Sequence, residues 1–485
     1  MPMYIKYMGE ESYGLVGFYI MLQAWMQLLD LGMTPTLIRE TARYRGGESS
    51  QLELRKLIRT LETIFYGITL SAVFLSYLFS DSVAINWLKV EHLPLDIVGT
   101  SIQLTAIAVV LRWVSSLYRG IVTGFEEIVW LSTYNIFIAL SRFIFVIPII
   151  LWVDNGPVSF FGYQLLISLT EVLLLRLKAY SLYASKVGKK SNISFFHWES
   201  LKGVLRFSGT IAFTASTWAI VTQADKLILS KILTLTDYAY FTLAIMASSG
   251  IAVLGNTSGI ALMPRFSKLS AEDKNEEILL LYRTSTKFIG AVTIPPSLAL
   301  AFFAQPILFI WTGDNEIASN TSKVLSLYSI GNCLLVFNAF PYYLQYAYGN
   351  LRLHLIGSIL FVLFFLPTLI YYSGQYGAVG ASWSWMLANF ISFIFWVAFL
   401  HKQLSPGLHL KWLFNDVGFS LICCLPFAIA LNYFISWPFH RLQAFFVLLI
   451  VCFILILSTL VPLLLTQHFI KIADLRRIYE KYTTR

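Results

Sequence analysis

QAFFVLLIVCFILILSTLVPLLLT, residues 443–466, is an apolar stretch without a single charged residue. A helix of about 20 such residues can cross the hydrocarbon core of a bilayer, because its backbone polar groups are hydrogen-bonded internally. Twelve further stretches are similar, so the sequence predicts thirteen transmembrane helices. The expected spans are 13–33, 60–79, 98–122, 129–153, 158–184, 204–231, 238–262, 287–311, 324–347, 354–373, 377–400, 412–434 and 443–466.

The composition agrees with an all-α, polytopic membrane protein. Hydrophobic residues make up 57% of the chain and charged residues 13%, with a mean hydropathy of +0.69. The net charge of +9 is explained by basic cytoplasmic loops, so we expect no nucleic-acid partner. All four cysteines lie inside apolar spans and are interpreted as packing residues, without disulfide or metal-ligand spacing.

Catalytic and cofactor motifs are missing from the sequence. We find no Walker loop, dinucleotide-binding glycine pattern, nucleophile elbow or paired metal-binding histidines. We therefore expect no cofactor, no metal and no enzymatic activity. Any energy for work would have to come from an ion gradient, a substrate gradient or a partner.

The distribution of Lys and Arg predicts the topology. Of the 35 basic residues, 25 fall in one set of alternate loops and the C-terminal tail, and six in the other set. Cytoplasmic loops retain positive charge, so the C-terminus is expected in the cytoplasm. An odd number of spans then places Met1 outside, although no signal sequence precedes it. We therefore expect that a first transmembrane helix is missing from this chain.

A weak internal repeat gives the same expectation. Residues 13–44 and 238–269 align without gaps at a shift of 225 residues, each being a span followed by a basic segment. In this register a helix matching 204–231 should precede Met1. The repeat predicts two six-helix lobes facing a cavity, a common transporter plan, followed by two extra helices. The expected domains are an N-terminal lobe at 1–185, a basic cytoplasmic linker at 186–202, a C-terminal lobe at 203–400, two additional helices at 401–466 and a basic tail at 467–485.

Six motifs along the chain carry a family resemblance. They are YIKYMGEESYGLVGFYIMLQAWMQLLDLGMTPTLIRETARYRG (4–46), LYRGIVTGFE (117–126), TQADKLILSKIL (222–233), ALMPRFSKL (261–269), WTGDN (311–315) and QYAYGNLRLH (345–354). They resemble O-antigen flippases of the Wzx type, in the polysaccharide-transporter branch of the MOP superfamily. The first helix that we expect to be missing would be a departure from that pattern.

This resemblance implies two six-helix lobes in a V shape and transport by alternating access. The implied substrate is an oligosaccharide repeat unit on undecaprenyl pyrophosphate, moved from the inner to the outer leaflet of a bacterial plasma membrane. A polymerase and a chain-length regulator of the same pathway are the implied protein partners.

Charged side chains inside the spans are the candidate site residues, since such groups are costly in a membrane and usually face a cavity or a partner. Arg112, Arg142 and Glu171 lie near the middle of their spans. The planar guanidinium group binds two phosphate oxygens at once, so we expect Arg112 and Arg142, with Arg119, to bind the substrate. Glu171 would pair with an arginine in the empty cavity or take up a coupling proton.

Other interpretations remain open for these residues. Glu171 could simply form a structural ion pair with Arg142 or Arg112. Asp30, Asp225 and Lys226 are further candidates for ion coupling or gating, with H⁺ or Na⁺ as the coupling ion. Alternatively, Asp225 and Lys226 form an interfacial pair, and Asp30 is engaged locally.

Two other functions compete with the flippase interpretation. A cation-coupled multidrug antiporter of the same superfamily would need acidic groups in its cavity, whereas the span centres hold two arginines and one glutamate. A membrane glycosyltransferase or polymerase would need carboxylates in a large outer loop. The outer loops are short, the longest being residues 80–97.

Overall fold

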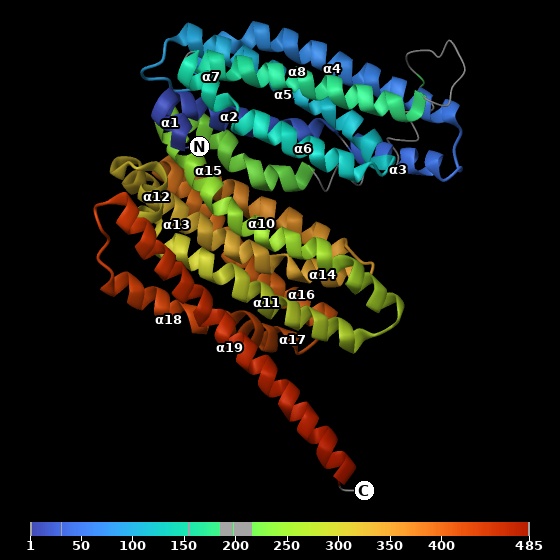
Figure 1. Ribbon diagram of the computed structural model, residues 1–485, viewed down its shortest axis with the longest axis vertical. Helices are drawn as coiled ribbons and strands as arrows, with labels where there is room; N and C mark the ends of the chain where they lie inside the picture. Colours follow the sequence, from blue (N-terminus) through green and yellow to red (C-terminus); the bar gives the residue numbers. More distant parts are fainter. Residues whose placement is uncertain (1, 31, 154–155, 185–196, 198–215, 484–485) are drawn as a thin grey trace. The chain divides into compact units, whose positions relative to one another are not determined.

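The computed structural model describes residues 2–30, 32–153, 156–184, 197 and 216–483 (Figure 1). Every regular element in these residues is a helix, apart from an isolated bridge between Lys89 and Thr234. The expected all-α fold is therefore confirmed.

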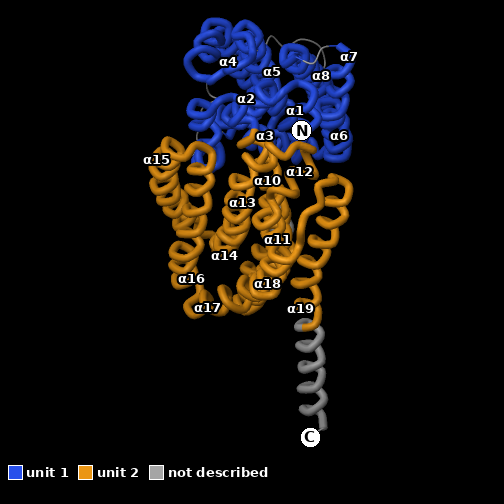
Figure 2. The backbone as a smooth tube through the Cα atoms, turned by 90° about the vertical axis from the view of Figure 1, so that its left-hand side faces the viewer, with its two compact units in different colours: residues 1–239 blue, residues 240–485 orange. Residues whose placement is uncertain are grey.

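The chain forms two compact units, residues 1–239 (unit 1) and 240–485 (unit 2), coloured separately in Figure 2. Each unit is described by itself below. The expected linker at 186–202 lies outside the described residues, apart from His197, and the domain boundaries predicted from the sequence stay predictions.

Unit 1 is arranged around one long central helix. Its elements are α1 (Pro2–Met8), α2 (Glu10–Met26), the 3₁₀ turn η1 (Gln27–Asp30), α3 (Met33–Arg45), α4 (Gln51–Asn86), α5 (Leu95–Gly124), α6 (Ile128–Phe143), α7 (Val146–Trp152), α8 (Pro157–Ala184) and a helix at 216–232. Helix α5 packs against α8, α4, α3 and α2 (Figure 1). Its central position explains why so many of its side chains are buried and why it can present a polar face inward.

Local sequence signals set the ends of the unit 1 helices. Ser50 begins α4 with a capping box: its hydroxyl accepts a hydrogen bond from the Glu53 amide, and the Glu53 carboxylate accepts one from the Ser50 amide. Gly32 precedes α3 with a φ of 74°, a left-handed conformation that glycine adopts without steric cost. The expected span at 13–33 is thus built from α2 and η1, with α3 as a separate helix.

Unit 2 contains the remaining helices. They are α10 (Leu235–Ala271, which begins in unit 1), α11 (Asn275–Phe302), α12 (Ala304–Thr312), α13 (Asn315–Asn338), α14 (Phe340–Ala347), α15 (Arg352–Ile391), the π-helical segment η2 (Ser392–Trp396), α16 (Val397–Leu404), α17 (Leu408–Lys411), the π-helical segment η3 (Trp412–Val417), α18 (Gly418–Phe434) and α19 (Arg441–Thr483). Asp314 caps α13 by accepting hydrogen bonds from the Glu316 and Ile317 amides at 2.7 and 3.2 Å.

Helix α15 is folded back on itself at Gly377. This glycine has φ 55° and ψ −133° inside the helix, a conformation that other residues rarely adopt. The Ser384 hydroxyl donates to the Thr368 carbonyl oxygen at 3.0 Å, and the Trp385 and Phe365 rings lie 5.5 Å apart. A straight helix could not bring these residues together. The two neighbouring spans expected at 354–373 and 377–400 are therefore separate arms that meet at Gly377.

The span expected at 287–311 is not one straight helix, and whether its two helices form a single span stays a prediction. Helices α11 and α12 meet at Phe303 with a bend of 83°. Pro306 gives the physical reason. Its ring would collide with the carbonyl group of Phe302 if α11 continued, whereas proline is tolerated in the first turn of a new helix such as α12.

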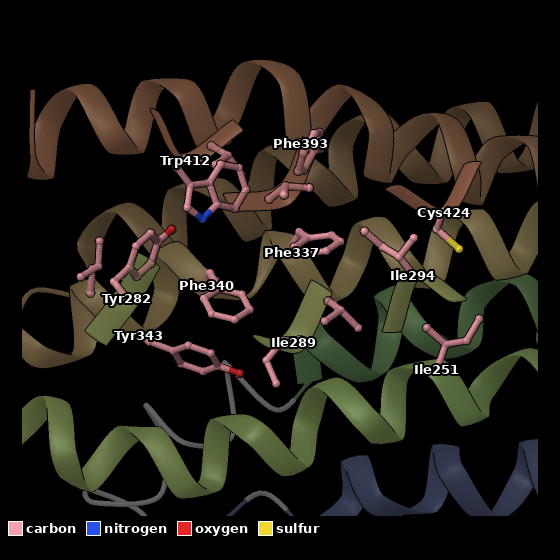
Figure 3. Close-up of a cluster of buried hydrophobic side chains, with 14 of the residues drawn as sticks. Ile251, Tyr282, Ile289, Ile294, Phe337, Phe340, Tyr343, Phe393, Trp412 and Cys424 are labelled. Carbon is pink, nitrogen blue, oxygen red and sulfur yellow. The ribbon is translucent and has the colours of Figure 1, made fainter. Parts of the chain in front are cut away.

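The core of unit 2 is aromatic and lies around Trp412, which is fully buried (Figure 3). Its indole nitrogen donates to the Thr286 hydroxyl at 3.0 Å. The Tyr282 hydroxyl and His401 Nε2 share a hydrogen bond of 2.7 Å, and the Nδ1 atoms of His401 and His409 lie 3.1 Å apart. These contacts join α11 to the elements that follow α15.

Nine helices of the described chain are long and apolar enough to span a membrane, or up to eleven if each bent pair is one span. The first part of the expected span 204–231 lies outside the described residues. The protein is thus a multi-pass membrane protein, and the count of thirteen spans stays a prediction.

Candidate functional site

A cavity of about 860 Å³ with several charged residues in its wall lies within unit 1. Its volume falls in the range of small-molecule binding sites. The cavity is lined by side chains from α2, η1, α3, α5, α6, α8 and the helix at 216–232. The charged residues in its wall are Asp30, Arg112, Arg119, Arg142 and Glu171. Five of the seven residues singled out from the sequence therefore come together in one cavity.

The centre of the charged wall is an ion pair between Arg142 of α6 and Glu171 of α8. Arg142 Nη2 and Glu171 Oε2 are 2.6 Å apart, and both side chains are only 2% exposed. The other guanidinium contacts are hydrogen bonds to side chains: the Tyr19 hydroxyl at 3.0 Å, the Ser168 hydroxyl at 3.2 Å and Gln164 Oε1 at 3.3 Å. Arg142 is therefore held rigidly, as a buried charge requires.

Glu171 bridges a second arginine on α5. Arg119 Nη2 lies 2.9 Å from Glu171 Oε1, and the Arg119 side chain is 32% exposed. Arg119 Nη1 also donates to Asn135 of α6. Arg112 and Arg119 are seven residues apart, so two helical turns bring them to the same face of α5. One carboxylate thus neutralises part of a cluster of three guanidinium groups.

Arg112 differs from the other two arginines in its partners. It donates a hydrogen bond from Nη1 to Gln23 Oε1 of α2. Within the described chain no carboxylate lies within ion-pair distance of it. Its charge is thus the one least compensated by a direct partner, and a cationic group in that position is suited to bind an anion.

Asp30 forms its hydrogen bonds with Thr34, four residues further along the chain. The Thr34 hydroxyl donates to its carboxylate at 2.5 Å, and the Thr34 amide lies 3.2 Å from the same group. These contacts tie η1 to the first turn of α3, which agrees with the local role that the sequence left open. Asp30 nevertheless lines the cavity.

Asp225 and Lys226 are not among the described residues that line this cavity. Lys226 Nζ lies 3.3 Å from Asp225 Oδ1 and donates to the Thr222 carbonyl oxygen at 2.6 Å. Asp225 is buried. Their proposed coupling or gating role stays a prediction, and the geometry agrees equally with a structural pair.

Several polar residues of unit 1 were missed by the sequence analysis. Glu62 is buried on α4, where its carboxylate accepts hydrogen bonds from the Tyr118 hydroxyl at 2.8 Å and the Tyr180 hydroxyl at 2.7 Å. Its place inside the expected span 60–79 was an available signal. Gln23 and Trp218, which line the cavity, carry no charge and so gave no signal in an apolar span. No group of three potential metal ligands occurs in the described residues.

Comparisons with known proteins give the family and the fold. Residues 1–270 match the family described as polysaccharide biosynthesis protein. A protein of Shigella flexneri named "Putative O-antigen transporter" is 21% identical over 417 residues, which is 84% of this chain and 91% of the relative.

Two solved structures have the same fold. The lipid II flippase MurJ in an inward closed conformation superposes with a TM-score of 0.71 at 19% identity, covering 95% of each chain. An inward-facing multidrug resistance MATE transporter of the MOP superfamily gives a TM-score of 0.63 at 15% identity, covering 83% of this chain and 94% of that one. The match over more than half of its length shows that the chain belongs to the polysaccharide biosynthesis protein family.

Proposed function

We propose that this protein is a flippase for an oligosaccharide linked to undecaprenyl pyrophosphate. It moves this substrate from the inner to the outer leaflet of the bacterial plasma membrane by alternating access, with its C-terminus in the cytoplasm. The family match, the name of the Shigella relative and the fold shared with a lipid II flippase support the proposal. A polymerase and a chain-length regulator are the proposed partners.

The single observation that carries this proposal is the cluster of three arginines in the cavity of unit 1. A pyrophosphate group cannot enter hydrocarbon alone, because each unpaired polar group costs several kcal/mol there. Guanidinium groups replace the lost water with charge-assisted hydrogen bonds and stay charged at physiological pH. Three arginines face two carboxylates in the wall, so the empty cavity holds an excess of positive charge.

The three arginines have different roles in this proposal. Arg112, without a carboxylate partner among the described residues, is the primary phosphate ligand. Arg119 is a second ligand once it separates from Glu171, and its partial exposure allows that movement. Arg142 uses both of its Nη groups on buried side-chain partners and mainly holds Glu171 in place.

Glu171 gives the proposal a coupling device. While the cavity is empty, its carboxylate neutralises Arg119 and Arg142 at 2.9 and 2.6 Å. A bound pyrophosphate would compete with it for the same N–H groups. A coupling ion, H⁺ or Na⁺, that bound to the Glu171 carboxylate would remove that competition.

A cation-coupled multidrug antiporter is the second candidate, favoured by the fold shared with a MATE transporter and by the two carboxylates in the cavity. An organic cation would have to approach Glu171 past two arginines bound to it. Like charges at these distances disfavour such binding. Export of cationic dyes by the purified protein, with no effect of pyrophosphate lipids, would favour this alternative.

The test is complementation of a strain from which the gene has been deleted. The deletion should accumulate lipid-linked repeat units on the inner leaflet, and the wild-type gene should restore surface polysaccharide. Arg112→Ala should fail to restore it at equal protein level, and Arg112→Lys should restore it in part, since the charge remains but the planar fork is lost. Normal surface polysaccharide in the deletion strain would contradict the proposal.

A further inference from the structure

We infer that the cavity of unit 1 contains a separate sugar-binding site, in which Trp218 stacks against the sugar ring attached directly to the pyrophosphate. The inference rests on the proposed function and deepens it, because it assigns the neutral part of the substrate to named residues.

Different elements contribute charged and neutral groups to the cavity wall. Four of its five charged groups, Arg112, Arg119, Arg142 and Glu171, come from α5, α6 and α8, and the fifth, Asp30, comes from η1. The helix at 216–232 contributes Trp218, Ala219, Thr222 and Gln223, none of which is charged. The segment of α2 and η1 adds two amides, Gln23, which accepts a hydrogen bond from Arg112, and Gln27. A substrate with an anionic and a neutral part would find a matching surface for each.

Trp218 is an exposed tryptophan in the wall of this cavity. It is 52% exposed, although it lines a cavity within the unit. Trp113, the other tryptophan in the wall, is 5% exposed and stacks on Phe65 with ring centroids 4.0 Å apart. The ring of Trp113 is therefore already occupied, whereas the exposed ring of Trp218 has no such stacking partner within the described residues.

An indole face suits a sugar ring for a physical reason. One face of a pyranose presents several C–H groups, which are weakly positive at hydrogen, and the aromatic face carries negative charge density. Burial of both faces removes apolar surface from water. The remaining edge of the sugar carries hydroxyl groups that need hydrogen-bond partners.

Two amides in the wall of the same cavity, Gln27 and Gln223, can serve those hydroxyl groups. Gln27 is exposed and Gln223 is half-buried. Gln223 makes a contact of 3.4 Å from its Nε2 to the Thr222 hydroxyl, which is long for a hydrogen bond. An amide both donates and accepts, as a hydroxyl does. Asp30 also lines the cavity, but its carboxylate is engaged by Thr34.

The assignment predicts a division of affinity between the two parts of the substrate. Arg112 should contribute to binding of any isoprenyl pyrophosphate, with or without a sugar. Trp218 should contribute only when a sugar is attached. A tryptophan that merely anchors the protein at the membrane interface would affect neither.

The experiment measures binding of two kinds of probe to the purified full chain in detergent. One probe is farnesyl pyrophosphate. The other is farnesyl pyrophosphate carrying a single hexose, prepared with glucose, galactose or N-acetylglucosamine. The variants are Trp218→Ala, Trp218→Phe, Gln223→Ala and Arg112→Ala, with Trp152→Ala as the matched control because Trp152 is exposed on α7 and does not line the cavity.

We expect Trp218→Ala to weaken binding of the best sugar-bearing probe about tenfold and to change binding of farnesyl pyrophosphate less than twofold. Trp218→Phe, which keeps a flat ring, should retain most of the affinity and guards against a folding defect. Gln223→Ala should cost a few-fold for the sugar probe alone, and Trp152→Ala should change nothing.

Three results would overturn the inference. The wild-type protein could bind the sugar-bearing probes no more tightly than farnesyl pyrophosphate, or Trp218→Ala could weaken both kinds of probe equally, or leave both unchanged. In each case binding of farnesyl pyrophosphate that depends on Arg112 would leave the proposed function standing. If the wild-type protein bound neither kind of probe, the proposed function would fail and the sugar site with it.

Discussion

Unit 1 and unit 2 each bury an apolar cluster, but they differ in the surroundings of their buried charges. Unit 1 encloses the ion pair of Arg142 and Glu171, and its charged groups line a cavity. Unit 2 encloses a core of aromatic and aliphatic side chains around Trp412 (Figure 3). In unit 2 the buried carboxylate of Asp416 forms ion pairs with two side chains of α11, Arg283 at 2.8 Å and Lys287 at 3.5 Å. Each of these basic side chains is about one-third exposed to solvent.

This difference separates a functional role for charge from a structural one. A buried ion pair is weak evidence for stability, because desolvation offsets most of the attraction. Charges that are kept around a cavity are therefore better explained by a ligand. In unit 2 the ion pairs join α11 to η3, and nothing in their geometry requires a ligand. Each prediction below asks whether the two units respond differently to matched changes.

The largest effect is expected for Arg142→Ala. It leaves Glu171 with Arg119 alone in a buried site, which should lower the free energy of unfolding by about 3–5 kcal/mol and abolish export. Thermal unfolding in detergent measures the first effect and surface polysaccharide the second. Arg142→Ala combined with Glu171→Gln should recover stability but not export. If Arg142→Ala alone were as stable as the wild type, this account of the ion pair would be contradicted.

Trp412→Ala should match that loss of stability without the loss of function. Trp412 is fully buried in unit 2, so truncation opens a cavity and costs about 3–5 kcal/mol. Trp412→Phe should cost less, about 1 kcal/mol for the hydrogen bond to Thr286 plus some packing. Export per folded molecule should equal that of the wild type in both variants. A fall in export larger than the fall in the amount of folded protein would contradict a purely structural role for Trp412.

Asp416→Asn should have a moderate effect. Arg283 and Lys287 lose a charged partner, but both can turn toward solvent, so the expected cost is about 1.5–3 kcal/mol. Thermal unfolding in detergent measures this loss of stability and compares it with the loss in Arg142→Ala. In that variant the remaining partner, Glu171, is buried. An equal or larger loss for Asp416→Asn would show that exposure of the partners does not govern the cost.

The smallest change in stability is expected for Arg112→Ala. Arg112 donates a hydrogen bond to Gln23 and forms no ion pair in the described chain. Its removal relieves repulsion from the neighbouring arginines, so the unfolding free energy should change by less than about 1 kcal/mol. Unfolding in detergent without farnesyl pyrophosphate measures the stability of the variant, and unfolding with this lipid measures its binding. The lipid should stabilise the wild type and leave the stability of the variant unchanged.

Much of the fold follows from the sequence because membrane spans leave a strong signal. The long apolar runs predict the helices, and the gap between the runs 354–373 and 377–400 predicts the boundary that lies at Gly377. The bend at Phe303 could not be predicted, because Pro306 within an apolar run is compatible with either a kink or a new helix. The direction of the chain after such a break depends on packing that the run itself does not encode.

The candidate site was predicted in part for a similar reason. Arg112, Arg142 and Glu171 were conspicuous because charges are rare inside spans. The bridge from Glu171 to Arg119 joins residues 52 positions apart on two helices, and only the packing of α5 against α8 brings them together. Trp218 is apolar in character and could not be distinguished from a residue facing lipid.

The most direct test of the central claim is flipping of a fluorescent isoprenyl pyrophosphate-linked sugar by the protein in proteoliposomes. Arg112→Ala and Arg112→Lys in unit 1 are compared with Arg283→Lys in unit 2, at equal amounts of folded protein. We predict that Arg112→Ala abolishes flipping, that Arg112→Lys retains a fraction of it, and that Arg283→Lys flips at the wild-type rate. Wild-type flipping by Arg112→Ala, or an equal loss in Arg283→Lys, would contradict the assignment of substrate binding to the cavity of unit 1.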